Sequence, residues 1–319
     1  MKAIVRTKYG SADVLKLKDI EKPTPKENEV LVKIYAAAVN PLDKYFMRGT
    51  PFFIRFVAGL VTPKYKTPGA DIAGQVEAVG ENVTQFQPGD EVYGDIHNSG
   101  FAEYARVPEK LLVLKPANVS FEEAAAIPVA GLTAVQILRD QMQIKPGQKI
   151  LINGASGGVG TYAVQIAKHY GADVTGVCST GNVDMVRSIG ADQVTDYTKE
   201  DFTQSGEFYD LILDNVGNRS VSELKRILAP NGMYLLNAFS PALMLQLGLQ
   251  SGKSKNGGQV MRNSDVAKAI QSDLEFLKEL FEAGTIKSVI DKVYPLSETP
   301  EAVRHLESGR ARGKIIIAI

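Results

Sequence analysis

The sequence has very little cysteine, with Cys178 alone among 319 residues. A single thiol excludes an intrachain disulfide and a cysteine-rich zinc site, because each of these needs several sulfur atoms from one chain. Cys178 ends an apolar stretch that is typical of a strand. We therefore expect a buried thiol that behaves as a small apolar side chain.

An excess of charge of one sign is also lacking, since 36 basic residues stand against 36 acidic ones. General nucleic-acid and anionic-membrane surfaces require a positive excess, so the balance argues against both. No apolar run is long enough to span a bilayer, and the opening residues lead into a strand-like pattern without the apolar core of a signal peptide. We therefore expect a cytoplasmic protein that acts on small molecules.

Length and composition favour two domains in one well-packed chain. The 319 residues exceed one ordinary domain, and 44% apolar with 23% charged residues suits a globular protein. Internal repeats, heptad runs and low-complexity tracts are absent from the sequence. Residues 251–258 form a polar, glycine-rich stretch that we expect to be a mobile loop.

The first part of the chain predicts a mostly β, barrel-like domain. Strand-like segments at 29–39, 72–79 and 91–93 are separated by proline and glycine. From about Phe121 the pattern changes to helices that alternate with buried strands, which predicts a doubly wound parallel sheet. Its expected strands are 150–153, 173–178, 193–195, 211–214 and 233–237.

The end of the chain predicts a return to the first domain. A helix is expected over 264–283, because apolar residues recur there at helical spacing. Residues 286–293 and 314–319 again resemble strands. We expect these last strands to join the sheet of the first domain.

The most informative motif is the glycine-rich run at 153–160, NGASGGVG, between an apolar strand pattern and a helical pattern that reaches about Tyr170. Gly157 and Gly160 take the second and third positions of the G-x-G-x-x-G fingerprint, and Ala155 replaces the first glycine. Such a turn lets backbone N–H groups and the helix dipole meet a pyrophosphate. Flexible turns use the same residues, but the strand pattern at 173–178 completes a βαβ unit and favours a dinucleotide site.

The residues after that second strand favour NADPH over NADH. An NAD site places an Asp or Glu there for the ribose 2′-OH, whereas this chain has Ser179 and Thr180. Hydroxyl groups donate to a 2′-phosphate, and a carboxylate would repel it. The counter-charge is not identified, because Arg187 lies a helical turn or more away. Alternatively, Ser179 and Thr180 cap the next helix, and the two roles are compatible.

Several further motifs follow one another in a recognisable order. They are AVNPLD at 38–43, GADIAG at 69–74 with Val79-Gly80, PGDEV at 88–92, GFAEY at 100–104, AGLTA at 130–134 and DNVG at 214–217. With the glycine-rich run, they resemble the zinc-independent, zeta-crystallin-like quinone oxidoreductase branch of the medium-chain dehydrogenase/reductase superfamily. The resemblance extends over essentially the whole chain.

The resemblance implies an α/β architecture with two domains. A GroES-like, mostly β catalytic domain would comprise 1–120 and 286–319, and a Rossmann domain with a doubly wound parallel sheet would comprise 121–285. The nicotinamide would lie in the cleft between them. The resemblance also implies a homodimer, formed by edge pairing of the Rossmann sheet near 233–238.

Zinc alcohol dehydrogenases of this superfamily place a Cys where Asn40 stands and a His-Glu pair where Ala70-Asp71 stands. The three histidines, His97, His169 and His305, are scattered along the sequence. We therefore expect no catalytic metal. Without a Lewis acid, alcohol oxidation loses its main stabilisation, whereas hydride transfer from NADPH to a quinone or an α,β-unsaturated carbonyl stays feasible.

The resemblance places Asn40, Asp43 and Tyr45 at the reaction centre, as an N-x-x-D-x-Y segment. Asn40 would orient the nicotinamide ribose or the substrate, Tyr45 would donate to the acceptor oxygen or supply a proton, and Asp43 would orient its neighbours. The alternative is that Asn40 and Asp43 are turn and cap residues and Tyr45 packs in the core. His97 is either a proton carrier or an ordinary loop residue.

The resemblance also names residues around the cofactor. Thr133 would lie near the nicotinamide, Tyr197 near the adenosine phosphate and Lys314 near the pyrophosphate, although a solvated cation is the alternative for Lys314. The full predicted set is Asn40, Thr133, Gly154, Ala155, Ser156, Gly157, Gly158, Val159, Gly160, Ser179, Thr180, Tyr197, Asn215, Val216, Ala238, Phe239, Ser240 and Lys314.

The segment 50–66 is unusually apolar for a connection, with Phe52, Phe53 and Phe56 in close succession. One hypothesis is that it forms, with residues 241–249, an apolar wall for an aromatic or lipid-derived acceptor, or a subunit interface. Packing in the core is the alternative. Sequence alone does not separate them.

The leading hypothesis is an NADPH-dependent reductase of quinones or conjugated enones. A second hypothesis is an NADPH-binding structural or regulatory protein with little turnover, because the fold could retain the cofactor after catalysis is lost. A third is an enoyl-thioester reductase. It is disfavoured because no obvious basic cluster receives a phosphopantetheine arm.

Overall fold

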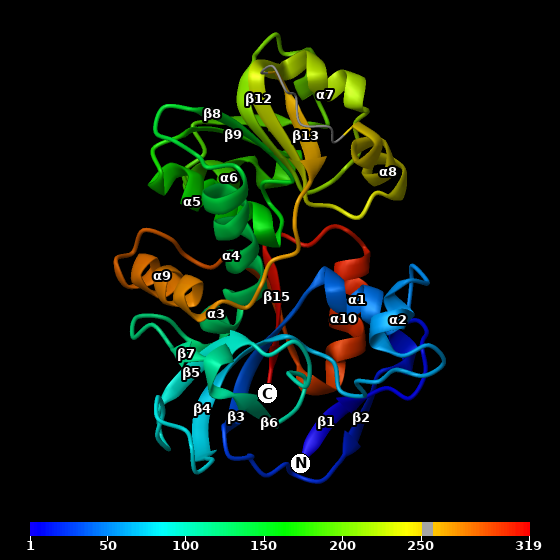
Figure 1. The fold of residues 1–319 in the computed structure, drawn as a ribbon, viewed down its shortest axis with the longest axis vertical. Coiled ribbons are helices and arrows are strands. Elements are labelled where there is room, and N and C mark those ends of the chain that lie inside the picture. The colour runs from blue at the N-terminus through cyan, green and yellow to red at the C-terminus, as the bar shows by residue number, and fades with distance from the viewer. Residues whose placement is uncertain (251–257) are drawn as a thin grey trace. The chain divides into compact units, whose positions relative to one another are not determined.

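The computed structural model describes residues 1–250 and 258–319, so the expected loop at 251–258 lies, except for Gly258, outside the described residues. The chain forms two compact units (Figure 1). Unit 1 comprises Met1–Leu132, Ala269–Gly284 and Ser288–Ile319, and unit 2 comprises Thr133–Lys268 and Thr285–Lys287.

Unit 1 is built on a seven-stranded sheet in the order β14-β15-β3-β4-β5-β7, with β6 paired to β3. All neighbours are antiparallel except β14 and β15. A separate hairpin pairs β1 with β2. The strands are β1 (Lys2–Val5), β2 (Lys16–Asp19), β3 (Glu29–Val39), β4 (Asp71–Val79), β5 (Glu91–Asp95), β6 (Tyr104–Pro108), β7 (Val113–Leu114), β14 (Ile290–Pro295) and β15 (Lys314–Ala318). The mostly β first domain and the return of the chain end to it are confirmed.

Short helices surround this sheet. They are η1 (Ala12–Val14), α1 (Pro41–Arg48), α2 (Ile54–Ala58), η2 (Glu109–Leu111), α3 (Phe121–Ala125), α9 (Gln271–Glu282), η6 (Leu296–Glu298) and α10 (Thr299–Glu307), while α4 (Pro128–Val135) crosses into unit 2. The core is made of alternate strand residues such as Val32, Ile34 and Ile72, which are at most 1% exposed. This alternation is what a sheet with one buried face requires.

Strand register brings three distant polar residues to one end of that sheet. β15 pairs with β3 so that Ile315 opposes Val39, and β3 pairs with β4 so that Ala38 opposes Asp71. Asn40 directly follows β3, and Lys314 begins β15. Residues 40, 71 and 314 are therefore neighbours, although they are far apart in sequence.

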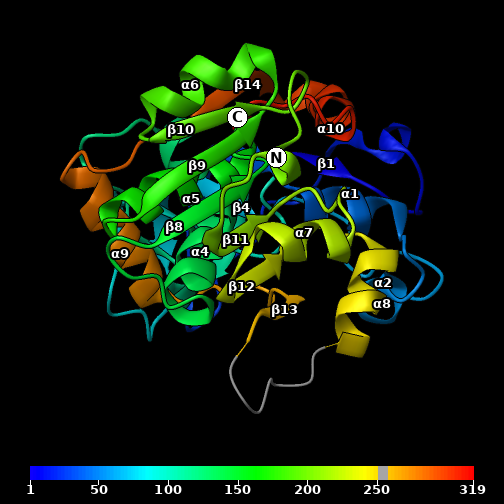
Figure 2. The same ribbon diagram turned by 90° about the horizontal axis from the view of Figure 1, so that it is seen from above.

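Unit 2 is a six-stranded sheet in the order β10-β9-β8-β11-β12-β13, with all neighbours parallel (Figure 2). Numbered from its own first strand, this order is 3-2-1-4-5-6, which is the Rossmann arrangement and confirms the predicted class. The strands are β8 (Lys149–Asn153), β9 (Asp173–Cys178), β10 (Gln193–Asp196), β11 (Tyr209–Asp214), β12 (Leu228–Leu236) and β13 (Val260–Asn263). The helical segments are η3 (Gln136–Gln141), α5 (Gly158–His169), η4 (Thr180–Asn182), α6 (Val183–Ser188), η5 (Phe202–Gln204), α7 (Val221–Ile227) and α8 (Pro241–Gln250).

The central strands of unit 2 are buried on both faces. Ile150, Leu151 and Ile152 in β8 are all 0% exposed, as are Ile212 and Leu213 in β11. Continuous apolar strands of this kind occur in parallel sheets, because crossover helices cover both faces. The order of strands reverses between β8 and β11, so the carboxyl ends of these two strands mark the switch point at which such sheets bind ligands.

The observed division of the chain differs from the expected one. We placed the first boundary near 121 and a helix over 264–283 in the Rossmann domain, whereas the units divide after Leu132 and Lys268. The helix is shorter, because α9 begins only at Gln271. It belongs to unit 1, where the Tyr93 hydroxyl donates to Leu274 O over 2.7 Å and Asn118 Nδ2 donates to Phe281 O over 2.8 Å.

The expected position of the dimer edge was wrong. We placed edge pairing near 233–238, but β12 already pairs with β11 on one side and β13 on the other. The edge strand on this side of the sheet is β13, which has only four residues. Such a short strand has too few residues for a period to show in the sequence, which is why it escaped the pattern.

The fold bears on two sequence features, the single cysteine and the lack of long apolar runs. Cys178 is 1% exposed, and burial raises the pKa of its thiol to about 11, which confirms a small apolar residue. Within residues 1–250 and 258–319, no helix combines the length and apolar character that a membrane crossing requires.

Candidate functional site

The glycine-rich run turns sharply at the carboxyl end of β8. Gly154 has φ +77°, a conformation that favours glycine. The N–H groups of Gly154 and Ala155 donate to Val177 O over 3.2 and 3.1 Å, which ties the turn to β9. The positive φ falls one residue before the replaced fingerprint position, so Ala155 is tolerated there.

The last two glycines of the run have different physical roles. A Cβ at Gly160 would lie 2.1 Å from Gly154 O, so this glycine permits close contact between helix and turn. A Cβ at Gly157 would meet nothing nearer than Gly154 O at 3.4 Å, so the fold itself leaves that space open. Gly157 is the N-cap of α5. The first backbone N–H groups of a helix have no partner within the helix, so they can bind an anion. The run therefore fits a dinucleotide pyrophosphate.

Hydroxyl groups gather beside the end of β9. Asn182 Nδ2 donates to Ser156 Oγ over 3.2 Å and to Ser179 Oγ over 3.1 Å. Because both serine oxygens accept from the amide, each serine keeps its own hydroxyl hydrogen to donate. Ser179 is the N-cap of η4, but its side chain makes no capping hydrogen bond. The arrangement suits an anion more than a helix cap.

Thr180 belongs to a second cluster around Asp196, at the end of β10. Its hydroxyl donates to Asp196 Oδ2 over 2.6 Å, and the Thr198 hydroxyl donates to Asp196 Oδ1 over 2.7 Å. These hydrogen bonds lower the pKa of Asp196 to about 2. Lys199 Nζ lies 3.4 Å from Asp196 Oδ2, with its side chain 69% exposed. Lys199 was not among the predicted residues, although it follows the predicted Tyr197 by two residues.

Asp214 organises the loop after β11. Its Oδ1 accepts from Asn153 Nδ2 over 2.8 Å and from the N–H groups of Val216 and Gly217 over 2.9 Å each. The Tyr234 hydroxyl donates to Oδ2 over 2.9 Å. Asp214 is 0% exposed, and burial raises the pKa of Tyr234 above its ordinary range. Buried Asp214 therefore holds the predicted cofactor residue Val216 at the switch point.

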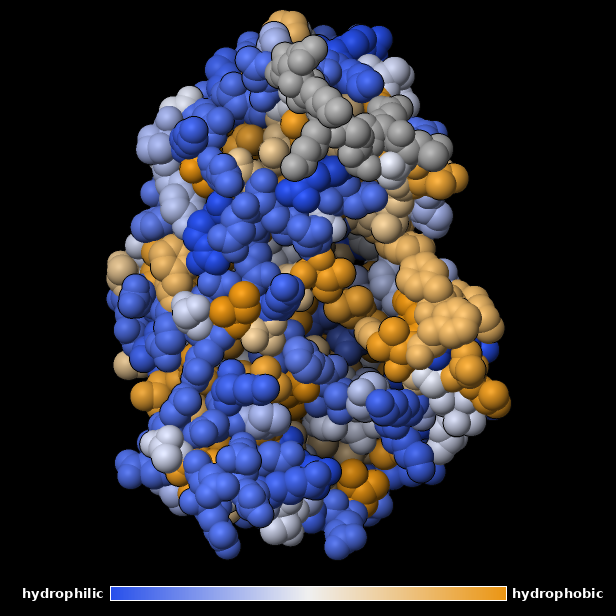
Figure 3. Space-filling view, viewed as in Figure 1, coloured by the Kyte–Doolittle hydropathy of each residue, from blue (hydrophilic) through white to orange (hydrophobic). Residues whose placement is uncertain are grey.

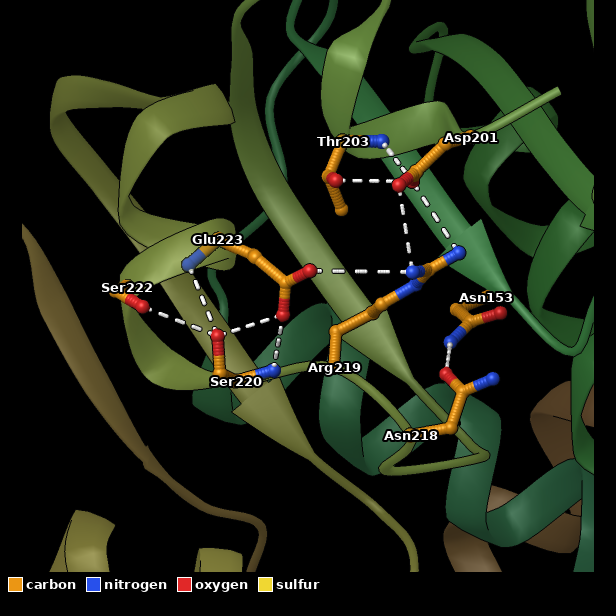
Figure 4. A network of polar contacts seen from close by, with 8 residues as sticks. All are labelled: Asn153, Asp201, Thr203, Asn218, Arg219, Ser220, Ser222 and Glu223. Atoms are coloured by element: carbon orange, nitrogen blue, oxygen red, sulfur yellow. Dashed lines mark hydrogen bonds and ion pairs between the residues drawn. The ribbon is translucent and has the colours of Figure 1, made fainter.

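A further polar network anchors the chain that leaves this loop (Figure 4). Asn153 Nδ2 donates to Asn218 Oδ1 over 3.3 Å. The Arg219 guanidinium reaches Asp201 at 3.2 Å and Glu223 at 3.9 Å, and Glu223 closes a capping box with Ser220 at the start of α7. These contacts connect β8, η5 and α7, so they fix the chain that follows the loop after β11.

The remaining predicted cofactor residues of unit 2 also follow strand ends. Tyr197 is 54% exposed, and its N–H donates to Cys178 O over 3.0 Å. Phe239 is 37% exposed, between Ala238 and Ser240 after β12. Thr133 lies on α4. Apart from Thr133, the set shares the carboxyl edge of the parallel sheet; cofactor contact by each residue stays a prediction.

In unit 1, buried Asp71 lies at the centre of a polar cluster. Its Oδ2 accepts from Lys314 Nζ over 3.0 Å and from Asn40 Nδ2 over 2.9 Å, and its Oδ1 accepts from Val129 N over 2.9 Å. The pair of Lys314 and Asp71 is 3% and 0% exposed. Burial raises the pKa of Asp71, and the adjacent ammonium opposes that rise.

Asn40 is fixed on every side. Its Oδ1 accepts from Lys314 Nζ over 2.6 Å, and its backbone N–H donates to Asp43 Oδ2 over 2.8 Å. Asn40 is the N-cap of α1 and is 2% exposed. The cap interpretation of Asn40 and Asp43 is therefore confirmed. Contact with ribose or substrate stays a prediction, since both amide atoms already bond within unit 1.

Asp43 is a buried carboxyl whose pKa rises to about 7, mainly because burial disfavours its charge. Backbone N–H groups of Asn40 and Gly69 partly offset this effect, at 2.8 and 3.3 Å. Arg6, 2% exposed, lies near it and donates from Nη1 to Phe46 O on α1. Arg6 is a second residue that the sequence analysis missed, because nothing in a first strand marks a buried arginine.

Tyr45 lies on α1, partly buried, with the Lys44 ammonium 4.4 Å from its ring centre. A fully buried core position is therefore wrong for this tyrosine, and its catalytic role stays a prediction. His97 lies in a loop with φ +66°, and Asp95 at 3.2 Å raises the pKa of its imidazole by hydrogen bonding. His97 is therefore a loop residue, and a role as proton carrier stays a prediction.

Models of known families match two parts of the chain. The alcohol dehydrogenase GroES-like domain matches residues 26–117, and the zinc-binding dehydrogenase domain matches residues 189–317. The 2-methylene-furan-3-one reductase of Solanum lycopersicum is 39% identical, over 99% of this chain and 79% of the relative. The chain belongs to the quinone oxidoreductase branch of the medium-chain dehydrogenase/reductase superfamily.

Two other proteins illustrate this branch. The chloroplastic NADPH-dependent alkenal/one oxidoreductase of Arabidopsis thaliana is 36% identical, over 99% of this chain and 79% of its own length. The structure of the quinone oxidoreductase from Coxiella burnetii has a TM-score of 0.88 at 29% identity, with 100% of this chain and 99% of that one covered.

The superfamily's catalytic zinc does not fit the residues that this chain has at the corresponding positions. Asn40 offers an amide, Ala70 offers no ligand atom, and Asp71 already pairs with an ammonium that would repel a metal cation. A tetrahedral site requires Cys, His or carboxylate donors that converge on one point. Within the described residues, no three His, Cys, Asp or Glu side chains are grouped to hold a metal.

The structure gives the Lys314 side chain a definite position. Its buried ammonium bonds to Asp71 and Asn40, so the alternative of a solvated cation is wrong. Contact with the pyrophosphate stays a prediction. A basic residue at this strand start was expected, but its carboxylate partner was not, because only the register of β3, β4 and β15 brings the two together.

Proposed function

We propose that this protein is an NADPH-dependent oxidoreductase that reduces quinones or α,β-unsaturated carbonyl compounds without zinc. The observation that carries the proposal is the glycine-rich turn at the switch point of a 3-2-1-4-5-6 sheet, with open space above Gly157. The names of relatives that act on alkenals, enones and quinones support the acceptor class.

Unit 2 would hold the cofactor. Backbone N–H groups at the start of α5 would bind the pyrophosphate, and the hydroxyl groups of Ser156 and Ser179 would donate to the 2′-phosphate. Lys199, exposed beside Thr180 and Asp196, is our candidate for the missing counter-charge. When bound, NADPH supplies the hydride.

Unit 1 would supply the polar groups for the acceptor. Tyr45 would donate its hydroxyl hydrogen to the acceptor oxygen, on which negative charge develops. Asp43 and Arg6 would hold α1 in place and so position Tyr45. Lys314 would neutralise Asp71 and fix the amide of Asn40. No residue of this arrangement requires a Lewis acid, which is the reason for proposing zinc-independent chemistry.

The first experiment is NADPH consumption by the purified protein with ortho- and para-quinones, α,β-unsaturated ketones and an enoyl thioester, with NADH in parallel. Acceptor-dependent use of NADPH with quinones or ketones is the expected result. Tight NADPH binding without turnover would favour the structural or regulatory alternative, and turnover of the thioester alone would favour the third hypothesis.

Tyr45→Phe tests the proposed donor. We expect kcat to fall at least about tenfold, with NADPH affinity unchanged, because the phenol would act on the acceptor alone. Equal kcat for both proteins would remove Tyr45 from the mechanism. Metal analysis of the active protein, purified without chelators, completes the test. One zinc per active chain would contradict the zinc-independent proposal.

We also propose a cytoplasmic homodimer, as the family resemblance implies. Since β12 is covered by β13, pairing at this side of the Rossmann sheet would use β13. Light scattering of the purified protein measures the assembly. A monomer at all concentrations would remove the dimer.

A further inference from the structure

Residues 51–66, which we name the tip segment, bring six large apolar side chains to the surface of unit 1. Their exposed fractions are 62% for Phe52, 58% for Phe53, 70% for Phe56, 70% for Val57, 54% for Leu60 and 84% for Val61. Figure 3 shows an apolar area over α2. Core packing is therefore the wrong interpretation of these phenylalanines. A contiguous patch of this size marks an interaction site more often than single exposed residues do.

The fold holds the tip segment in this exposed state. The Tyr9 hydroxyl donates to Gly59 O, and Arg55 Nε donates to Gly49 O over 3.0 Å. The Arg55 guanidinium also lies 4.6 Å from the centre of the Tyr9 ring. Ala58, the last residue of α2, is 0% exposed and faces inward. The apolar side chains thus point outward from an anchored turn.

Basic residues flank the apolar side chains along the chain. Residues 44–70 contain five basic residues and no acidic one: Lys44, Arg48, Arg55, Lys64 and Lys66. Arg48 pairs with Glu307 at 2.5 Å, whereas the other four have no carboxylate partner in the part of the chain that the structure describes. The chain as a whole is neutral, so this excess is local.

We propose that the tip segment docks on the surface of an anionic lipid bilayer. Phenylalanine and aliphatic side chains between cations suit the boundary between headgroups and acyl chains, where the apolar groups insert and the cations meet lipid phosphates. The neutral composition argued against a general membrane surface, and the tip segment is a local exception. Docking at the boundary needs no membrane-spanning helix, and the proposal does not depend on reductase chemistry.

Charge also decides against a second copy of this chain as the occupant. A two-fold interface places the same patch on both partners, so the unpaired cations of one copy would face those of the other. Like charges across an interface disfavour association. An anionic bilayer supplies the complementary charge instead.

Flotation of the full-length protein with vesicles tests the proposal. We use vesicles of phosphatidylcholine alone and of phosphatidylcholine mixed with phosphatidylserine in equal parts. Each is tested at low salt and at about 0.5 M salt, where screening limits attraction between charges to a few ångströms. We expect binding to the anionic vesicles, weak binding to the neutral ones, and loss of binding at high salt. Absence of binding to anionic vesicles would overturn the proposal.

Matched variants separate this site from general stickiness. Lys64→Glu/Lys66→Glu should weaken binding to anionic vesicles by about 25-fold or more, because each removed cation contributes about fivefold. Its control is Lys16→Glu/Lys18→Glu, which makes the same charge change on exposed β2 and should leave binding within about threefold on the same scale. Equal losses from the two variants would overturn the proposal.

Phe56→Ser/Val57→Ser removes two apolar side chains and should weaken binding at least about tenfold. Its control is Phe208→Ser/Val266→Ser, which removes a phenylalanine and a valine of similar exposure in unit 2. Circular dichroism verifies that each variant is folded. If the tip variant changed the mass of the protein in solution and left vesicle binding intact, the occupant would be another protein chain and the proposal would fail.

Discussion

Two lysine–aspartate pairs, one in each unit, show how burial changes the role of the same chemistry. Lys314 and Asp71 are 3.0 Å apart with side chains 3% and 0% exposed, whereas Lys199 and Asp196 are 3.4 Å apart with side chains 69% and 10% exposed. In the second pair, water screens the exposed ammonium of Lys199 and leaves it able to exchange partners. In the first pair neither charge can lose its partner without a large cost. The buried pair therefore maintains a fixed geometry, and the exposed pair suits ligand binding.

The largest expected effect comes from breaking the buried pair. Lys314→Met should lower the free energy of unfolding by about 3–5 kcal/mol, because Asp71 keeps a buried charge without its cation. Urea unfolding measures the loss, and Lys314→Met/Asp71→Asn should recover part of it. Lys199→Met is the matched control, with a change below about 0.5 kcal/mol. A loss below about 1 kcal/mol for Lys314→Met would show that burial is not the difference between the two pairs.

The pH dependence of stability sharpens the comparison for Asp43. Its pKa is 3.8 in the unfolded chain and about 7 in the folded one, so between these values only the folded state holds the proton. Stability then falls as the pH rises from about 4 to 7, by up to about 1.4 kcal/mol per pH unit. Asp43→Asn should remove this slope, although the variant should be less stable than the wild type.

Urea unfolding of both proteins between pH 5 and 8 measures that slope. Asp196 is the opposite case, because hydrogen bonds lower the pKa of its carboxyl to about 2 and keep it ionised over this range. Asp196→Asn should therefore leave the slope between pH 5 and 8 unchanged. Parallel curves for the wild type and Asp43→Asn would contradict the elevated pKa of Asp43.

Two glycine substitutions separate folding from binding within unit 2. Gly160→Ala should lower the free energy of unfolding by about 1–3 kcal/mol, because its Cβ would lie 2.1 Å from Gly154 O. Gly157→Ala should cost less than about 1 kcal/mol, because its Cβ meets open space. Gly157→Ala should nevertheless weaken NADPH binding by about tenfold or more, since its methyl group enters the predicted pyrophosphate space.

Thermal unfolding and NADPH fluorescence titration measure these two effects separately. A Gly157→Ala protein that binds NADPH as tightly as the wild type would show that the cofactor does not approach this turn. A fully stable Gly160→Ala protein would show that the turn adapts at low cost.

The smallest expected effect on stability comes from the exposed pair. Lys199→Gln should change the free energy of unfolding by less than about 0.5 kcal/mol but weaken NADPH binding by about tenfold, because a phosphate contact to a cation is lost. NADH binding should not change. Lys225→Gln, at an exposed position on α7, is the control. Equal losses for NADPH and NADH would assign Lys199 a role away from the 2′-phosphate.

Much of the architecture was predictable because its signals are local. The apolar strands and the glycine-rich run of unit 2 lie within a short stretch of chain, and β3 and β9 match their expected bounds. The edge strand β13 and the start of α9 were not predictable from periodicity. The first is too short to show a period, and the apolar spacing that suggested an earlier helix start continues through residues 264–270, which are not helical.

The candidate site divides in the same way. Asn40, Asp43 and the glycines are marked by motifs, and the cap role of Asn40 follows from a proline and an aspartate within three residues. The charge partner of Lys314 and the burial of Arg6 carry no local signal. Lys199 was within reach of the sequence, since a cation two residues after Tyr197 could have been considered for the 2′-phosphate.

By itself, the sequence determined the family, the dinucleotide turn and the alternation of elements, because each depends on residues close together in the chain. Only the tertiary structure decided which charges are buried and which face water. The register of three strands places Lys314 on Asp71, and an anchored turn holds the phenylalanines of the tip segment outward. Charge energies depend on solvent exposure, and solvent exposure is a property of the packed chain rather than of any segment.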